Sequence, residues 1–114
     1  MARAGVDLDV VAAFHASLGA TIPATPNSIK AQVKVFNGAD DPFIKSENLT
    51  ELLNGMEVGG ADFEYVSYPG VLHSFTSMAA TAKGEELGLP LKYDAQADKD
   101  SWARTLAMLD ERLK

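Results

Sequence analysis

The stretch FEYVSYPGVLHSF, residues 63–75, decides the fold of this chain. Its first six residues are rich in aromatic and β-branched side chains, and Phe63 and Tyr65 share one face of a two-residue period, which predicts a strand. Pro69 and Gly70 then favour a turn, after which His73 stands between an apolar run and an aromatic residue. This histidine has two interpretations: a partly buried ring satisfied locally, or a catalytic base at the end of a strand.

Two further strands are predicted upstream of this stretch. Residues 32–36, QVKVF, alternate in polarity and are rich in β-branched residues, and the turn cluster NGADDP ends them. Val10–Phe14, VVAAF, is a nearly continuous apolar run, which is typical of a parallel strand buried on both faces. Prolines and an asparagine between the two strands predict a loop over residues 20–28.

Two helices are predicted from apolar periodicity. Ser46–Val58 carries an i, i+3, i+4, i+7 pattern, with Ser46 as its expected N-cap and glycines beyond its end. Residues 101–113 form the second helix, and one apolar stripe on it consists of Trp102, Leu106, Leu109 and Leu113. Trp102 is expected to be a core or pocket-wall residue. Residues 83–100 are polar and are expected to be irregular, with at most a helical turn.

The order of these elements predicts the fold class. Strand, loop, strand, helix, strand, loop and helix follow one another, and such alternation indicates an α/β layer with a parallel sheet of about three strands and flanking helices. A chain of 114 residues forms one domain at most.

Composition and charge exclude several function classes. The formal net charge of −6 disfavours nucleic acid and anionic membranes as partners. No apolar run approaches the length of a membrane-spanning helix, and the first residues do not resemble a signal peptide, so a cytoplasmic protein is expected. The absence of cysteine excludes disulfides, thiolate metal sites and a cysteine nucleophile. No cofactor and no metal ion are expected.

Ionisable side chains follow the predicted strands where functional groups of α/β proteins gather, beyond the carboxyl ends. Asp40 and Asp41 come after the second strand and His73 after the third, and a right-handed crossover brings these two loops side by side. A carboxylate beside an imidazole can fix its tautomer and stabilise its protonated form, which is the acid–base half of a catalytic triad. His15 ends the first strand and is expected to be a packed or solvated histidine.

Three motifs together carry a resemblance to a known family. FNGADDPF, FEYVSYPGVLHSF and GLPLKYDAQADKDSW closely resemble the C-terminal part of the dienelactone hydrolase family, which has the α/β-hydrolase fold. The resemblance runs from about Val10 to the last helix and implies a single partial α/β-hydrolase domain over residues 1–114. It implies Asp41 as the triad acid, His73 as the triad base and a small ester or lactone as substrate.

The nucleophile of that family is missing from this chain. Family members carry a cysteine or serine in a G-x-C-x-G or G-x-S-x-G turn upstream of the matched motifs. Here no serine has glycines at both flanking positions, so the acid and base stand without a recognisable attacking group. Ser17, after the first strand, and Ser74, beside His73, are the local candidates.

The apolar strand Val10–Phe14 also predicts a partner. The resemblance implies that this strand is an inner strand of the whole fold and that its neighbour is missing here, and a bare apolar edge invites pairing with another chain. We expect either a two-fold homodimer through this strand or a chain that supplies the missing N-terminal half. Two functions remain open: a hydrolase of small esters or lactones, and a non-catalytic, self-associating α/β module.

Overall fold

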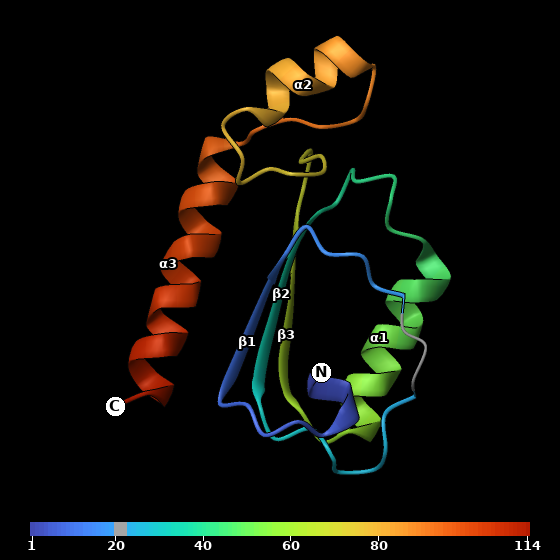
Figure 1. The fold of residues 1–114 in the computed structure, drawn as a ribbon, viewed down its shortest axis with the longest axis vertical. Helices are drawn as coiled ribbons and strands as arrows, with labels where there is room; N and C mark the ends of the chain where they lie inside the picture. The colour runs from blue at the N-terminus through green and yellow to red at the C-terminus, as the bar shows by residue number, and fades with distance from the viewer. Residues whose placement is uncertain (20–22) are drawn as a thin grey trace.

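The computed structural model describes residues 1–19 and 23–114, which form an α/β layer (Figure 1). The elements are η1 Ala2–Ala4, β1 Val10–Phe14, β2 Gln32–Gly38, α1 Ser46–Val58, β3 Asp62–Tyr68, α2 Ala80–Leu87 and α3 Ala95–Arg112. Residues 20–22 of the predicted loop lie outside the described residues. No helix in the described ranges is long and apolar enough to cross a membrane. The predicted fold class, with three parallel strands and flanking helices, is confirmed.

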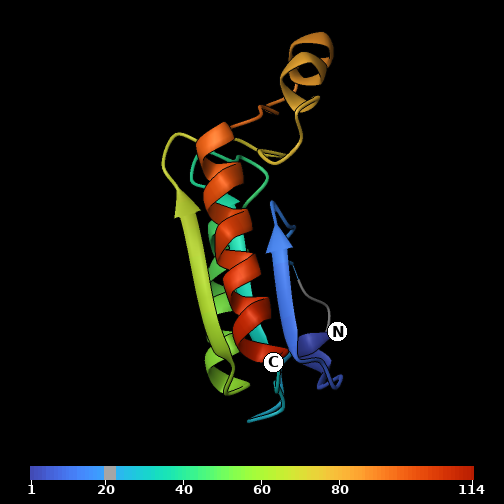
Figure 2. The same cartoon turned by 90° about the vertical axis from the view of Figure 1, so that its left-hand side faces the viewer.

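The sheet has the strand order β1-β2-β3, and both strand pairs are parallel. α3 covers one face and α1 covers the opposite face, whereas α2 lies beyond the carboxyl ends of the strands (Figures 1 and 2). β2 is the central strand: Val33 and Val35 pack into the core on the α1 side, and Phe36 packs into a second core with Ala97 of α3. Because all three strands are parallel, the loops that follow them meet at the carboxyl ends of the strands, which we call the carboxyl edge of the sheet.

The bounds predicted for α1 are confirmed. Its buried residues include Leu52 and Met56, which join Val33 and Val35 in one cluster. Burial of each such side chain contributes roughly 1.5–3 kcal/mol, so this contact helps to attach α1 to the sheet. The predicted cap is wrong by one residue, because Lys45 occupies the N-cap position and makes no side-chain capping bond.

The segment 83–100, predicted to be irregular, overlaps two helices. α3 begins at Ala95, where the Asp94 side chain accepts a hydrogen bond of 2.8 Å from the backbone N–H of Ala97. α2 depends on Gly84, since a Cβ atom at this position would overlap the carbonyl of Leu91. Neither helix begins with an apolar stripe, and the close approach of Gly84 to Leu91 has no periodic signature, so periodicity did not predict these helices.

The apolar stripe predicted on the last helix is not the face that α3 buries. Trp102, Leu106 and Leu113 are 55%, 49% and 56% exposed. The buried face consists of Ala97, Ser101, Thr105 and Met108. Ser101 and Thr105 can face the sheet because their hydroxyls donate to carbonyls of the same helix, at 3.1 and 2.8 Å. Of the two roles predicted for Trp102, the core role is wrong, and its side chain borders an open cavity instead.

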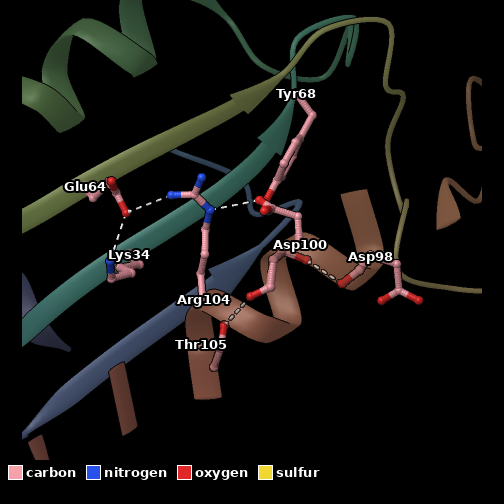
Figure 3. Close-up of polar contacts among 8 residues, drawn as sticks. Lys34, Glu64, Tyr68, Asp98, Asp100, Arg104 and Thr105 are labelled. Atoms are coloured by element: carbon pink, nitrogen blue, oxygen red, sulfur yellow. Dashed lines mark hydrogen bonds and ion pairs between the residues drawn. The ribbon is translucent and has the colours of Figure 1, made fainter. Parts of the chain in front are cut away.

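A polar network orients α3 over β2 and β3 (Figure 3). The Tyr68 hydroxyl donates to Asp100 at 2.7 Å, and Asp100 also accepts a hydrogen bond of 2.8 Å from Arg104. Arg104 lies 3.8 Å from Glu64, which pairs with Lys34 at 2.9 Å. Burial and the Asp100 carboxylate raise the pKa of Tyr68, and the bond from Tyr68 lowers the pKa of Asp100. Exposed pairs of this kind contribute about 0–1 kcal/mol each, so the network sets orientation more than stability.

β1 is the outer strand of the sheet, next to β2. All five of its residues are half-buried, and the only strand with which they pair in the described part of the chain is β2. Its apolar side chains therefore lie at an edge rather than inside the sheet, as the bare-edge prediction requires.

Candidate functional site

The candidate site lies at the carboxyl edge of the sheet, where the loops after β2 and β3 meet. Gly38 ends β2, and a Cβ atom there would overlap the Val71 carbonyl, so only glycine allows this close approach. The same carbonyl accepts a hydrogen bond of 3.0 Å from the N–H of Asp40, and the N–H of Ala39 donates to Tyr68 at 2.8 Å. These backbone bonds fix the two loops against each other.

The side chains of Asp41 and His73 meet across these loops. Nδ1 of His73 lies 2.7 Å from Oδ2 of Asp41, and Oδ1 of Asp41 accepts a hydrogen bond of 2.9 Å from the N–H of Phe43. The Asp41 side chain is 0% exposed, whereas the His73 side chain is 26% exposed. A carboxylate in its charged form can only accept, so this contact fits a His73 tautomer with the proton on Nδ1, which leaves Nε2 outside the contact. Asp40, by contrast, is exposed.

Two aromatic rings border the His73 imidazole. Phe43 lies edge-on at 5.1 Å between ring centroids, and His15 lies at 5.4 Å with an angle of 72° between the planes. His15 follows β1, and its Nε2 is 2.9 Å from Oγ1 of Thr76. Burial, together with the nearby His73, lowers the pKa of His15.

His15 was predicted to be a packed or solvated histidine, and the structure adds that it packs against His73. One sequence signal could have found it, because His15 follows the carboxyl end of a strand, at the edge where Asp41 and His73 also lie.

The two candidate serines lie in different surroundings. Ser74 is half-buried and has a positive φ of 61°, and Ser17 is exposed. Ser17 lines a cavity with Val11 and Leu18, whereas His15 lines a different one. Within the described part of the chain, neither hydroxyl is hydrogen-bonded to His73. The Asp41–His73 pair has the groups to accept and return a proton, and no hydroxyl of residues 1–19 and 23–114 is hydrogen-bonded to its imidazole.

A metal site is not formed by the acids and histidines of this edge. Residues 1–19 and 23–114 hold no group of three or more histidine, cysteine, aspartate or glutamate side chains placed to bind a metal ion.

An open cavity of about 330 Å³ lies beside His15, and it is lined by Phe14, His15, Thr76, Asp98 and Trp102.

The family assignment rests on a match over nearly the whole chain. The model of the dienelactone hydrolase family matches residues 1–113. The chain belongs to the dienelactone hydrolase family. The resemblance predicted from three motifs is thereby confirmed, and it supports a hydrolase in general terms. No curated protein matches the chain.

Solved structures of dienelactone hydrolases share the fold. The chain is similar to P91, a dienelactone hydrolase-like promiscuous phosphotriesterase from metagenomic libraries, with 26% identity and a TM-score of 0.80. It is also similar to a structure named m3DLH, with 30% identity and a TM-score of 0.83. A dienelactone hydrolase described as putative, from Klebsiella pneumoniae subsp. pneumoniae, has 22% identity and a TM-score of 0.68, and shows the fold alone.

The match is unequal in length. The alignments cover 97%, 97% and 94% of this chain but 45% of each of the three solved chains. The chain therefore spans less than half the length of the three solved chains that it matches.

Proposed function

We propose that this chain provides the acid–base part of the active site of a hydrolase that acts on small carboxylic esters or lactones. Asp41 orients the imidazole, and His73 is the base. The observation that carries the proposal is the 2.7 Å contact between a fully buried carboxylate and a partly exposed imidazole at the carboxyl edge of the sheet. Membership of the dienelactone hydrolase family supports the same chemistry.

The proposed chemistry follows from the free Nε2 of His73. This atom takes the proton of an attacking hydroxyl or thiol as the new bond to the ester carbonyl carbon forms. The proton then passes from the imidazolium to the leaving alkoxide as the carbonyl re-forms, and a second cycle with water releases the acid. Asp41 stabilises the imidazolium between these transfers without becoming protonated itself.

We further propose that the nucleophile belongs to a polypeptide segment outside these 114 residues. None of the described serines is hydrogen-bonded to His73, and the chain has no cysteine. The solved relatives are more than twice as long as the part that this chain matches, which leaves ample chain to carry a nucleophile turn.

The outer face beside β1 supports this second proposal. One side of the strand borders an open cavity of about 460 Å³, which Val11 and Ala13 help to line. The other side borders the cavity of about 330 Å³ that Phe14 and Trp102 help to line. A further strand next to β1, with its own helices, would fill both cavities and cover the exposed stripe of α3.

A complementation experiment tests the proposed function. The chain is mixed, or expressed together, with the upstream part of a dienelactone hydrolase that carries the nucleophile turn, and hydrolysis of a chromogenic short-chain ester is measured. We expect activity that neither part has alone and that His73→Ala abolishes. Activity that is equal with and without His73 would contradict the proposal, as would labelling of Ser17 or Ser74 by an organophosphate, which would place the nucleophile within this chain.

A non-catalytic, self-associating module is the second candidate function. The exposed stripe of α3 and the outer position of β1 favour it. A two-fold axis perpendicular to the sheet would pair β1 antiparallel with its mate and bring two α3 stripes together on one face. Such a dimer leaves the two Asp41–His73 pairs at opposite edges, so each remains incomplete. A dimer by light scattering, together with a failed complementation, would favour this candidate.

A further inference from the structure

His15 is held in place by the strand that it follows and by the neighbouring strand. Its N–H donates to the Phe36 carbonyl at 2.8 Å, which continues the β1–β2 ladder by one residue. The next N–H, of Ala16, donates to Oδ1 of Asn37 at 3.1 Å, and Asn37 is 0% exposed. Between these two bonds His15 has a φ of 39°, a conformation that non-glycine residues adopt rarely. The backbone on both sides therefore sets the direction of the His15 side chain.

The ring of His15 is fixed as well. Its Nε2 lies 2.9 Å from Oγ1 of Thr76, and its face or edge meets Phe75 at 5.5 Å with an angle of 86° between the planes. Phe75 is 0% exposed, so this second contact is part of the core. A ring with one polar and one aromatic anchor cannot rotate freely.

The tilt of the His73 imidazole relative to its hydrogen bond with Asp41 depends on the rings that pack against it. The hydrogen bond from Nδ1 to Asp41 restrains rotation of the ring about its Cβ–Cγ bond at a single atom, and the rings packed against the imidazole limit how far it can tilt about that contact. Phe43 and His15 lie against the ring at 5.1 and 5.4 Å, and both meet it edge-on. Edge-to-face pairs at this separation are favourable and directional. Phe43 is 53% exposed, so His15 is the more firmly held of the two neighbours.

We propose that His15 is a positioning residue for His73: its anchored ring forms, with Phe43, the pair of walls that fixes the plane of the His73 imidazole against Asp41. The proposal rests on the proposed function only for its consequence in catalysis, since the orientation of His73 can be measured without activity. Nothing in this role requires His15 to contact substrate.

The charges that face His15 fit this role. The titratable groups around it are His73, Asp41 and, across the open cavity, Asp98. Burial lowers the pKa of His15 and His73 lowers it further, while Asp41 opposes the change. The lowered pKa favours the neutral form of His15, which can lie against His73 without placing a second positive charge beside it.

The test is the low-field NMR signal of the His73 Nδ1–H in the full chain, read for three variants of His15. His15→Phe keeps the ring and should keep the signal. His15→Ala and His15→Gln remove the ring, and Gln retains a group able to bond Thr76. For both we expect exchange of the Nδ1–H with water to rise about two- to tenfold, the range that corresponds to one edge-to-face aromatic contact.

Amide dispersion and the unfolding midpoint are recorded for each variant, so that loss of structure is separated from loss of orientation. His15→Gln carries the test should His15→Ala not fold. An unchanged exchange rate in His15→Gln would overturn the proposal, and so would equal acceleration in His15→Phe and His15→Gln, because a ring would then not be what matters. Failure of the ester-hydrolysis experiment leaves this result unaffected, so the two proposals fail separately.

Discussion

The Asp41 carboxylate and the His73 imidazole leave different loops and meet at 2.7 Å, with the carboxylate fully buried. The second carboxylate oxygen is also engaged, by the N–H of Phe43 at 2.9 Å. A carboxylate held at both oxygens cannot turn away from the imidazole. Nε2 of His73 is therefore the ring atom left for proton transfer.

Asp41→Asn should reduce ester hydrolysis by the complemented protein on the order of 10⁴-fold, because an amide can donate to Nδ1 and stabilise the wrong tautomer of His73. The measurement is kcat/KM for a chromogenic short-chain ester. Asp40→Asn is the matched control, since Asp40 is adjacent but exposed, and it should leave the rate within twofold. Equal losses from both variants would mean that the loop, and not the contact with His73, is what matters.

Gly38→Ala should destabilise the chain by more than about 1 kcal/mol, because the added Cβ overlaps the Val71 carbonyl and forces apart the loops that carry Asp41 and His73. Urea unfolding gives the free energy. Gly19→Ala is the control, since the nearest atom to its Cβ would be 3.8 Å away, and its effect should be smaller. A Gly38→Ala variant as stable as the Gly19→Ala variant would show that the loops do not approach as described.

Leu106→Glu and Met108→Ala separate the two faces of α3. Met108 is 2% exposed and Leu106 is 49% exposed. Met108→Ala should lower the free energy of unfolding by about 2–5 kcal/mol. Leu106→Glu should change it by less than about 0.5 kcal/mol, but should weaken association of the chain with itself or with a complementing part. Size-exclusion chromatography reads the association, and an elution profile unaffected by Leu106→Glu would remove the α3 stripe from the interface.

His15 should make stability depend on pH below neutrality. Its pKa is lowered from the usual 6.5 by burial and by His73, so the unfolded chain binds a proton more readily than the folded chain. The stabilisation is fully present above about pH 6.5 and is lost as the pH falls through the lowered folded-state pKa. Urea unfolding at several pH values between 7.5 and 4.5 measures it.

His15→Gln should flatten that pH dependence. Asp100, whose pKa is also lowered, contributes only below its usual 3.8 and so lies outside this window. If the free energy of unfolding falls with decreasing pH equally steeply in the wild type and in His15→Gln, His15 is not the cause of the pH dependence.

Local chemistry predicts the three strands and α1. It also predicts that the loops carrying Asp41 and His73 meet. Periodicity gave the faces of Phe63 and Tyr65, turn residues gave the ends, and the handedness of the crossover brought the loop of Asp41 to that of His73. These signals do not depend on the rest of the molecule.

The packing of α3, the position of α2 and the contact of His15 depend on approaches between segments, which a periodic sequence pattern does not encode. α3 has two faces able to pack, and only the contacts with the sheet select the one with Ser101 and Thr105. α2 depends on the approach of the Leu91 carbonyl to Gly84. The place of His15 after a strand could have indicated that it lies near His73, but the contact itself depends on the positive φ of His15, which the sequence pattern does not encode.

The tautomer of His73 tests the central claim most directly. A long-range proton–nitrogen NMR spectrum of the full chain, recorded at a pH where the ring is neutral, distinguishes a protonated Nδ1 from a protonated Nε2. We expect the proton on Nδ1, facing Asp41, and a shift toward the Nε2 form in Asp41→Asn. A wild-type ring protonated mainly on Nε2, and unchanged by Asp41→Asn, would contradict the acid–base pair on which the proposed function depends.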